Sequence, residues 1–551
     1  MIKVYVLNTG SYAEVAGGTK LSRIAADIAG QLPFRPICAR VNNKTEGLNY
    51  EVYSPKDVEF LDRTSDSGQR VYVRSLCMML YRAVTLLYPG ARVCLEHSVS
   101  RGYFCRIKGA DVPVDADALV AKMHELSRAA LPFRRREERR TEVIELFRRQ
   151  GLADKVKLLE TIHDPYVVYH TLDGLADMYY GCLAPDTSMI DVFALTPYHD
   201  GFLLRGFDPA NPAVPPQPVT QEKMFRAFTD YLEFNRVLGV SNVGEMNAAV
   251  DAGKARDIIN VAEALHEKYI TKISDEITRR YHRGGARFVL IAGPSSSGKT
   301  TTCKRLAVQL MTNLLKPVTI SLDNYFVDRQ HTPRDAGGDY DYENLYALDL
   351  EAFNADLNAL LEGKEVKLPT YSFETGQRFY KGDSIRLDEG SILLIEGIHG
   401  LNPDLTRQVP ESQKFRVYVS ALTTLSIDDH NWVPTTDNRL LRRMIRDYKY
   451  RGTTALETLR RWPKVRAGEE RWIFPYQENA DATFNSSLIF ELGVIKDTAL
   501  EVLRGVTGDC PEYATAYRLL KFLSYFRAIP PEAVPPTSLL REFLGGSSFH
   551  Y

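Results

Sequence analysis

Apolar residues in the C-terminal half of the chain form short continuous runs separated by helical stretches. Between residues 285 and 551 these runs are FVLIA, VTISL, ILLIEG, FRVYVS and SLIFEL. Continuous rather than alternating apolarity is typical of strands that are buried on both faces, as in a parallel sheet beneath helices. The pattern therefore predicts an α/β fold for residues 285–551, with a parallel sheet covered by helices.

The N-terminal part mixes shorter strand and helix patterns. Residues 1–62 contain the strand candidates IKVYVL, PICARVN and DVEFLD around one helical stretch, in which apolar residues recur at helical spacing from Leu21 to Leu32. Residues 68–206 open with a helical run and continue into the strand candidates ARVCLEHSV and GYFCRI. These patterns predict two α+β units, a small one followed by a larger one.

A proline-rich segment separates these units from the rest of the chain. Residues 207–221 read FDPANPAVPPQPVTQ, a composition that resists both helix and sheet. The residues that follow look helical and carry alternating charges, and Gly284-Gly285 then precedes the strand RFVLIAG. We therefore expect a linker and helical connector over 207–284 and a separate domain over 285–551.

Composition and charge exclude several classes of protein. Lysine and arginine number 69 against 70 acidic residues, so the formal net charge of −1 gives no overall attraction to nucleic acid or to a membrane. The seven cysteines form no Cys-x-x-Cys pair, which argues against a zinc knuckle or a disulfide framework. No apolar run approaches the roughly 20 residues of a membrane helix. We expect a cytoplasmic protein without a membrane partner, and we leave a homo-oligomer open.

One motif after the first apolar run indicates a phosphate-binding loop. It fits G-x-x-x-x-G-K-[ST] between a predicted strand and a predicted helix, the context that such a loop requires. The glycines allow successive N–H groups to face phosphate oxygens, the lysine reaches the β and γ phosphates, and the threonine binds Mg²⁺. The alternative is a chance turn rich in serine and glycine. The residues are Gly293, Pro294, Ser295, Ser296, Ser297, Gly298, Lys299 and Thr300, with Thr301 next.

Two carboxylates follow later apolar runs. Asp323 ends TISLD, and Glu396 directly follows SILLI, so both are expected at the carboxyl edge of the sheet. Asp323 could accept the proton of an acceptor hydroxyl or order the metal, whereas the alternative is a helix-capping aspartate. From its position, Glu396 is suited to hold magnesium through water.

A run of arginines follows in TTDNRLLRRMIRDYKYRG. Arg439, Arg442 and Arg446 can share one helical face, with Arg443 as the fourth member of the run. Clustered guanidinium groups would neutralise the charge of a transferring phosphoryl group. An isolated run of this kind more often forms a solvated basic face. The phosphate-binding loop in the same domain favours the functional interpretation.

Together these motifs resemble the uridine kinase and phosphoribulokinase family of P-loop kinases. Six segments occur in the family's order between Arg287 and Ser487: GPSSSGKTT, SLDNYF, LPTYSF, LLIEGI, DNRLLRRMIRDYKYRG and FPYQENADATFN. The resemblance implies ATP and Mg²⁺ as cofactors. It also implies that Asp323 is the general base, that Glu396 is associated with the magnesium, and that Arg442 and Arg446 lie near the phosphates. The acceptor-site residues it implies are Tyr371, Phe373 and Arg439, with Asp341 or Glu343 holding the ribose hydroxyls.

The sequence departs from this family at the base pocket. Uridine-cytidine kinases usually carry a histidine shortly after the Tyr-x-Phe element, whereas YSFETGQR places Gly376 there. Since a missing buried donor can reject a substrate strongly, phosphoryl transfer is a firmer expectation than uridine as the acceptor.

The N-terminal part resembles two modules of threonyl-tRNA synthetases. Residues 1–62 resemble the TGS module, and residues 68–206 resemble the second additional, or editing, domain, through LYPGARVCLEHSVSRGYFCRI, LPFRRREERRTEVIELFRRQG and DGLADMYYGCLAPDTSMI. The same order of modules, followed by a linker and a kinase, occurs in a group of bacterial uridine or nucleoside kinase-like proteins.

The editing motif itself is degenerate in this chain. Its two histidines, its cysteine and its last histidine align with Arg74, Met78, Tyr179 and Leu183, so we expect no deacylation of tRNA. His97 lies on a predicted strand outside the motif and is interpreted as structural. The run RRREERR could contact RNA phosphates, but its glutamates favour a solvated helix.

We expect an ATP- and Mg²⁺-dependent kinase that phosphorylates the 5′-hydroxyl of a nucleoside such as uridine or cytidine. One alternative is a kinase for another ribose- or sugar-type acceptor. A second is an RNA- or ribosome-associated regulator that uses the P-loop as a nucleotide switch and binds RNA through residues 1–206. A third retains an editing activity with different residues.

Overall fold

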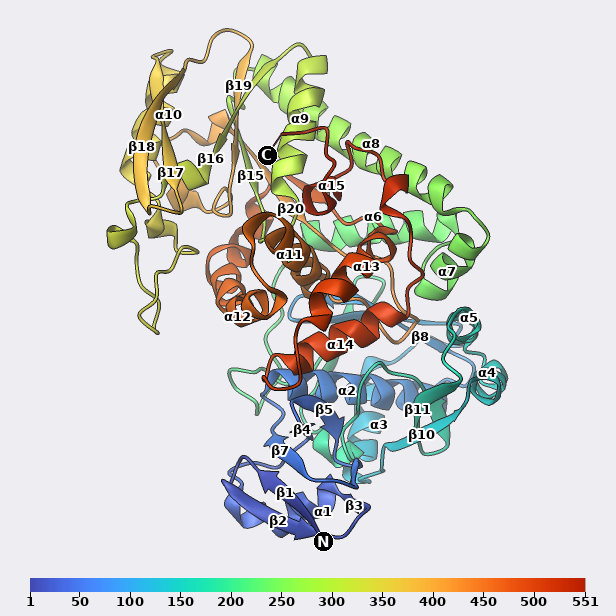
Figure 1. The fold of residues 1–551 in the computed structure, drawn as a ribbon. Coiled ribbons are helices and arrows are strands. Elements are labelled where there is room, and N and C mark those ends of the chain that lie inside the picture. Colours follow the sequence, from blue (N-terminus) through green and yellow to red (C-terminus); the bar gives the residue numbers. More distant parts are fainter. Residues whose placement is uncertain (551) are drawn as a thin grey trace.

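The structure is a computed structural model that describes residues 1–550. The chain forms an elongated molecule with the N-terminal module (residues 1–62) at one end and the sheet of the C-terminal domain (residues 285–550) at the other (Figure 1). A middle module (residues 66–206) and the last helices of the chain lie between them. The C-terminus returns to the C-terminal domain, close to its sheet.

The N-terminal module contains a five-stranded sheet, a separate two-stranded pair of β3 and β6, and one short α-helix. The strands lie in the order β2-β1-β7-β4-β5, and β1 is parallel to β7. Val4, Val58 and Phe60 belong to a core that this module builds from its own residues. Its elements are β1 (Ile2–Val6), β2 (Ser11–Val15), β3 (Thr19–Lys20), α1 (Leu21–Asp27), β4 (Cys38–Val41), β5 (Lys44–Gly47), β6 (Glu51–Val52) and β7 (Lys56–Leu61).

The middle module packs two antiparallel sheets around a long buried helix. One sheet has the order β13-β14-β9-β8 and the other β10-β11-β12. The long helix, α2, begins at the N-cap Ser65, whose hydroxyl accepts a hydrogen bond from the Gly68 N–H. The elements are α2 (Asp66–Leu87), β8 (Arg92–Val99), β9 (Gly102–Lys108), α3 (Ala116–Arg128), β10 (Arg134–Arg139), α4 (Arg140–Arg149), α5 (Ala153–Thr161), β11 (Tyr166–Leu172), β12 (Leu175–Asp177), β13 (Ala194–Tyr198) and β14 (Gly201–Arg205).

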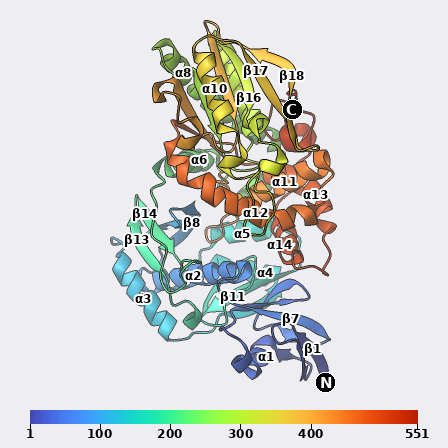
Figure 2. The same cartoon turned by 90° about the vertical axis from the view of Figure 1, so that its left-hand side faces the viewer.

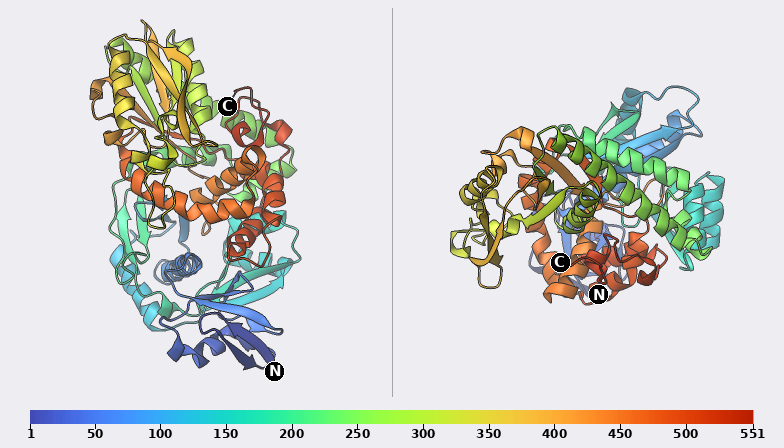
Figure 3. Two further views of the ribbon diagram at one scale, coloured as in Figure 1. Left: turned by 60° about the vertical axis from the view of Figure 1, so that its left-hand side comes forward. Right: turned by 90° about the horizontal axis from the view of Figure 1, so that it is seen from above.

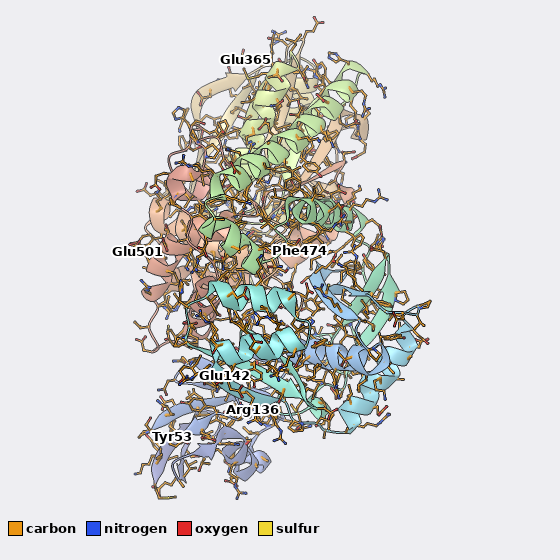
Figure 4. The ribbon with its side chains drawn as sticks, turned by 90° about the vertical axis from the view of Figure 1, so that its right-hand side faces the viewer. Tyr53, Arg136, Glu142, Glu365, Phe474 and Glu501 are labelled. Atoms are coloured by element: carbon orange, nitrogen blue, oxygen red, sulfur yellow. The ribbon has the colours of Figure 1, made fainter. Side chains whose placement is uncertain are left out.

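The run RRREERR is a strand and not the solvated helix that its sequence favoured. Arg134–Arg139 pairs antiparallel with β11, and the helix begins only at Arg140. All six strand residues are exposed, and alternating charges are well suited to such an edge strand because they deter pairing with other chains. Arg136 on this strand and Glu142 on α4 lie between Tyr53 of the N-terminal module and Glu501 of the C-terminal domain (Figure 4).

Three connector helices follow the proline-rich segment: α6 (Glu222–Leu238), α7 (Val243–Asp251) and α8 (Ala255–His282). The proline-rich segment is bound to the middle module, because Ser100 Oγ donates to the Val219 carbonyl and Arg205 Nη1 donates to the Pro216 carbonyl, at 2.6 and 2.8 Å. Helix α8 packs along the C-terminal domain, where Arg305 pairs with Glu267 at 2.7 Å.

The C-terminal domain contains the predicted parallel sheet, with the strand order β16-β19-β15-β20-β21. Alternate residues of β15 face opposite sides: Phe288 packs toward α10, and Val289 packs into the core shared with α8 and α9. Helices thus cover both faces, and the β17–β18 hairpin lies at the outer side beside α10 (Figure 2). The elements are β15 (Phe288–Ala292), α9 (Lys299–Thr312), β16 (Lys316–Ser321), α10 (Leu350–Leu361), β17 (Val366–Ser372), β18 (Gln377–Ile385), β19 (Ser391–Glu396), β20 (Lys414–Ser420), α11 (Thr435–Arg451), α12 (Ala455–Trp472), β21 (Ala482–Asn485), α13 (Glu491–Arg504), α14 (Tyr513–Ser524) and α15 (Arg541–Leu544).

The prediction that SLIFEL is a strand was wrong. The fifth strand is the preceding segment, Ala482–Asn485, and Leu488, Phe490 and Leu492 are buried at the start of α13. A short apolar run does not distinguish a buried strand from a buried helix end, so tertiary packing decided this element.

One continuous core joins the middle module to the C-terminal domain. It extends from α2 and α5 through the connector helices to α11, α13 and α14. The last helices lie between the middle module and the parallel sheet (Figure 3). A buried ionic network crosses the same boundary: Lys155 of α5 contacts Asp177 at 3.0 Å and Asp428 at 2.7 Å, and the His430 ring contacts Asp177 at 2.8 Å. Among residues 1–550, no helix has the length and apolarity needed to cross a bilayer.

Candidate active site

The phosphate-binding loop connects β15 to α9 at the carboxyl edge of the parallel sheet. A Cβ on Gly293 would lie 1.9 Å from the carbonyl oxygen of Val419, so no side chain fits there. Gly298 has a left-handed φ of +84°, and a Cβ on it would lie 2.6 Å from the Leu539 side chain. Ser296 also adopts a positive φ, of +57°. These conformations curl the loop and leave the N-terminus of α9 facing the edge of the sheet.

The loop's lysine and threonine lie with the two predicted carboxylates. Thr300 Oγ1 donates to Glu396 Oε2 at 3.0 Å, and Lys299 Nζ donates to the Pro294 carbonyl at 3.1 Å. Glu396 ends β19 opposite Ser321, the last residue of β16, so Asp323 emerges two residues beyond the same edge. The strand order thus gathers residues that are about one hundred positions apart in sequence.

The electrostatics of these groups are coupled. Burial raises the pKa of Glu396 to about 7, although the Lys299 ammonium opposes this shift. Burial also raises the pKa of Asp323, again against the effect of Lys299. Burial lowers the pKa of Lys299, and Glu396 is the strongest opposing influence. Two carboxylates and one ammonium therefore share a region of low dielectric, as is common where proton transfer and phosphate binding occur.

The oxygens of Thr300 and Glu396 fit a magnesium ion that is held mainly by phosphate and water. Magnesium usually takes only one or two protein oxygens beside substrate phosphates. Within residues 1–550, no group of three or more His, Cys, Asp or Glu residues is placed to hold a metal ion alone. The hydroxyl and the carboxylate are therefore suited to a metal that arrives with the nucleotide.

Helix α11 holds the loop through its arginines. Arg439 Nε donates to the Ser295 carbonyl at 2.9 Å, and its guanidinium also pairs with buried Glu469. Arg442 is fully buried, where it pairs with Glu491 at 2.6 Å and donates to the Ser486 carbonyl at 2.9 Å. Arg439 thus contacts the loop backbone directly, and Arg442 is linked to it through Ser486, whose hydroxyl donates to the Ser297 carbonyl.

Arg443 and Arg446 lie further along the same helix. Arg443 Nη1 donates to Ser295 Oγ at 2.7 Å, and Arg446 pairs with Asp447 at 2.8 Å. Arg446 and Arg451 oppose the burial-induced rise in the pKa of Asp323, so both are near enough to act on that carboxylate. Arg443 was not assigned to the shared helical face, although its spacing of four from Arg439 was a signal that could have placed it there.

Two of the three predicted acceptor residues, Tyr371 and Phe373, form an aromatic group, whereas the third, Arg439, lies against the phosphate-binding loop. The ring centroids of Tyr371 and Phe373 are 5.0 Å apart, and Phe326, which follows the Asp323 segment, lies 5.4 Å from Tyr371. Phe373 is exposed and Tyr371 is buried. The aromatic group therefore lies next to the segment that carries the candidate base.

Gly376 occupies a position where no histidine fits. It has a φ of +73°, and a Cβ on it would lie 2.7 Å from Nε of Arg329. The Arg329 guanidinium lies against this glycine, donates to the Tyr342 hydroxyl at 3.1 Å and also donates to the Phe373 carbonyl. A guanidinium group therefore lies beside position 376.

The two residues predicted to hold ribose hydroxyls differ in environment. Asp341 Oδ1 accepts from the Glu343 N–H at 3.2 Å and so shapes the local turn. Burial raises the pKa of Glu343 to about 7, Glu469 adds to the rise, and Arg443 and Lys299 oppose it. Glu343 is therefore within electrostatic reach of Arg443 and Lys299, whereas Asp341 stabilises the segment that carries it.

Sequence reasoning missed three carboxylates around the loop. Glu469 accepts from the Ser295 N–H at 3.0 Å, and Glu491 holds Arg442. Glu542 of α15 accepts from the Thr301 hydroxyl at 2.6 Å, so the end of the chain contacts the start of α9. No spacing rule links these residues to the loop, because each arrives from a distant segment.

The degenerate editing positions do not form an acid–base site. Met78, Tyr179 and Leu183 are buried, and Arg74 donates to the Cys182 carbonyl at 2.9 Å. His97 stacks on Phe228 with centroids 3.9 Å apart, and burial lowers its pKa to about 3. His97 is thus a neutral core residue, as its position on a strand indicated.

Comparison with known proteins supports both resemblances. Residues 288–489 match the family described as Phosphoribulokinase / Uridine kinase family. Residues 288–489, which form most of the C-terminal domain, are thus similar to this family of kinases.

The N-terminal half is similar to threonine–tRNA ligases. It is 29% identical over 195 residues to the enzyme of Methylococcus capsulatus, covering 35% of this chain and 31% of that protein. It is 27% identical over 170 residues to the enzyme of Desulforamulus reducens, covering 30% and 27%. The chain thus spans less than a third of the length of these curated relatives.

Similar solved structures include two kinases. One is described as a putative fructose transport system kinase from Silicibacter sp. TM1040, with 18% identity, a TM-score of 0.28, and coverage of 39% of this chain and 98% of that one. The other is a possible uridine kinase from Bacillus stearothermophilus, with 19% identity, a TM-score of 0.26 and the same coverage.

Proposed function

We propose that this protein is an ATP- and Mg²⁺-dependent kinase that transfers the γ-phosphate to the 5′-hydroxyl of a nucleoside. The observation that carries the proposal is the convergence of Lys299, Thr300, Asp323 and Glu396 at one edge of a parallel sheet. This edge belongs to a domain that matches a family of small-molecule kinases.

Each of these residues has a role that its surroundings support. Asp323 accepts the proton of the acceptor hydroxyl, since its raised pKa makes it a better base than an ordinary aspartate. Lys299 and the N–H groups of the loop bind the phosphates, while Thr300 and Glu396 hold the magnesium, which neutralises phosphate charge when bound. Arg446 and Arg451 add positive charge near Asp323.

A second candidate acceptor is another ribose- or sugar-type alcohol. The observation that favours it is the Arg329 guanidinium packed against Gly376, where a uridine kinase would present an imidazole. Arg329 donates hydrogen bonds and accepts none, so it suits an acceptor that presents oxygens rather than a pyrimidine edge with both donors and acceptors.

The test is a screen of purified full-length protein for ADP release against nucleosides and sugar-type alcohols. Phosphorylation of uridine or cytidine at the 5′-hydroxyl would support the first acceptor class, and turnover only with a sugar would support the second. Lys299→Ala should abolish either activity. The absence of turnover with every acceptor, combined with steeply salt-dependent RNA binding by residues 1–206, would favour the RNA-associated regulator.

A further inference from the structure

A large cavity lies where the three parts of the chain meet, far from the P-loop in sequence. Its volume is about 720 Å³, within the range of roughly 300–1,000 Å³ typical of small-molecule sites. The N-terminal module contributes Lys20 and Lys44, the middle module contributes Arg74 and His170, and α14 contributes Arg518 and Lys521. Helix α14 also contacts β5 of the N-terminal module, so the cavity exists only in the assembled chain.

The lining carries a strong excess of positive charge. Seven lysines and arginines face two glutamates, Glu46 and Glu51. The charged forms of two of these side chains are disfavoured. Burial and the neighbouring Arg518 lower the pKa of Arg70 to about 10, and burial together with Lys44 lowers the pKa of Lys521. An anion bound between them would relieve this repulsion, so the cavity is electrostatically prepared for phosphate.

The cavity also presents groups that recognise an aromatic ring. Tyr179, Tyr180 and Tyr517 line it, and the Lys44 ammonium lies 4.4 Å from the centroid of the Tyr517 ring. His170, which is only 4% exposed, also lines the cavity. Aromatic rings of this kind can stack with a base, and a neighbouring cation adds to that contact.

We propose that this cavity is a second nucleotide site, which binds a small nucleoside phosphate through its basic residues and its aromatic rings. Two of the four degenerate editing positions, Arg74 and Tyr179, line this cavity, but the histidines and the cysteine of the editing motif are absent from all four, and α14 comes from the C-terminal domain. The proposed role is therefore binding and not hydrolysis. A small nucleotide is favoured over an RNA strand because the whole binding surface lies within one cavity of nucleotide size.

The cavity is connected to the P-loop by one ion pair. Arg518 donates to both oxygens of Asp437, at 2.5 and 2.8 Å, and Asp437 lies in the first turn of α11. The same helix supports the P-loop through Arg439 and Arg443. A phosphate that draws Arg518 away from Asp437 would change the position of α11, so the nucleotide regulates the kinase site; this part rests on the proposed function.

The binding test uses full-length protein with Lys299→Ala, so that nucleotides do not bind through the P-loop lysine. Calorimetric titration with CTP, UTP, GTP and inorganic tripolyphosphate should reveal one saturable site for at least one nucleoside triphosphate, tighter than for tripolyphosphate. Adding Lys521→Gln should weaken this binding at least tenfold, and Arg74→Ala should do the same. Arg23→Ala, on the exposed face of α1, is the matched control and should change nothing.

Three outcomes would overturn the proposal. One is that no nucleotide binds, and another is that binding is unchanged in both cavity variants. The third is that only an RNA hairpin ending in CCA binds, in a manner sensitive to Lys521→Gln, which would make the cavity an RNA site. These readouts need no acceptor, so they remain decisive if the kinase screen fails.

Coupling is measured separately by hydrogen–deuterium exchange in the Lys299→Ala protein. Addition of the bound nucleotide should change the exchange of residues 435–451 as well as that of the cavity lining. Exchange that changes only at the cavity would overturn the regulatory part of the proposal.

Discussion

At the residue scale, the candidate site depends on a few groups whose protonation is set by burial. Asp323 is the proposed base, and its Asp323→Asn variant should bind ATP normally yet lower kcat about a hundredfold or more, because a positioned base contributes roughly this factor. Steady-state kinetics and ATP titration provide the two measurements. Asp388→Asn, an exposed carboxylate change, is the control. Near-normal turnover of Asp323→Asn would remove the proposed role.

A second residue-scale prediction concerns pH and magnesium. Burial raises the pKa of Glu396 to about 7, so below pH 7 a proton increasingly occupies the carboxylate that holds the metal. The apparent affinity for Mg²⁺ should therefore fall between pH 8 and pH 6, approaching a tenfold loss per pH unit on the acidic side. The measurement is the Mg²⁺ concentration for half-maximal rate at fixed ATP. In Glu396→Gln this pH dependence should largely disappear, and its persistence would count against the assignment.

At the element scale, helix α11 is a support for the phosphate-binding loop. Arg442 and Glu491 are both buried, and Ser486, which accepts from Arg442, donates to the Ser297 carbonyl at 2.5 Å. The buried pair thus ties α11 and α13 to the loop. Whether Arg442 also acts on phosphate, as the family resemblance implies, stays a prediction.

Arg442→Met should lower the free energy of unfolding by about 3–5 kcal/mol, because it leaves the Glu491 carboxylate buried without a partner. Denaturant unfolding measures this loss. Combining it with Glu491→Leu should recover much of the stability, whereas Arg451→Met at the exposed end of α11 should change it by less than about 0.5 kcal/mol. A stable but inactive Arg442→Met protein would instead point to a direct role at the phosphates.

At the scale of the whole molecule, the N-terminal module has its own core and also contributes Ile37, Cys38 and Leu61 to the larger core that the middle module shares with the C-terminal domain. The Lys155 network lies inside that shared core, where Asp177 and Asp428 raise the lysine's pKa despite burial. We therefore expect the middle module and the C-terminal domain to unfold together.

Deletion of residues 1–62 should leave a folded remainder, whereas residues 285–551 alone should expose the shared core and aggregate or unfold without cooperativity. Thermal unfolding and size-exclusion chromatography distinguish the two fragments. If the 285–551 fragment unfolds cooperatively with the same midpoint temperature as the full chain, the C-terminal domain does not need the shared core for its stability.

The sequence by itself determined the parallel sheet, the phosphate-binding loop and the edge positions of Asp323 and Glu396. These follow from local spacing and from the rule that parallel strands present their carboxyl ends together. Only the tertiary structure shows which segment forms the fifth strand and which carboxylates hold the phosphate-binding loop. It also shows that Arg329 fills the space beside Gly376. It also decided that α14 closes a basic cavity against the first two modules. These features depend on contacts between segments that lie from tens to hundreds of residues apart, and no local pattern records such contacts.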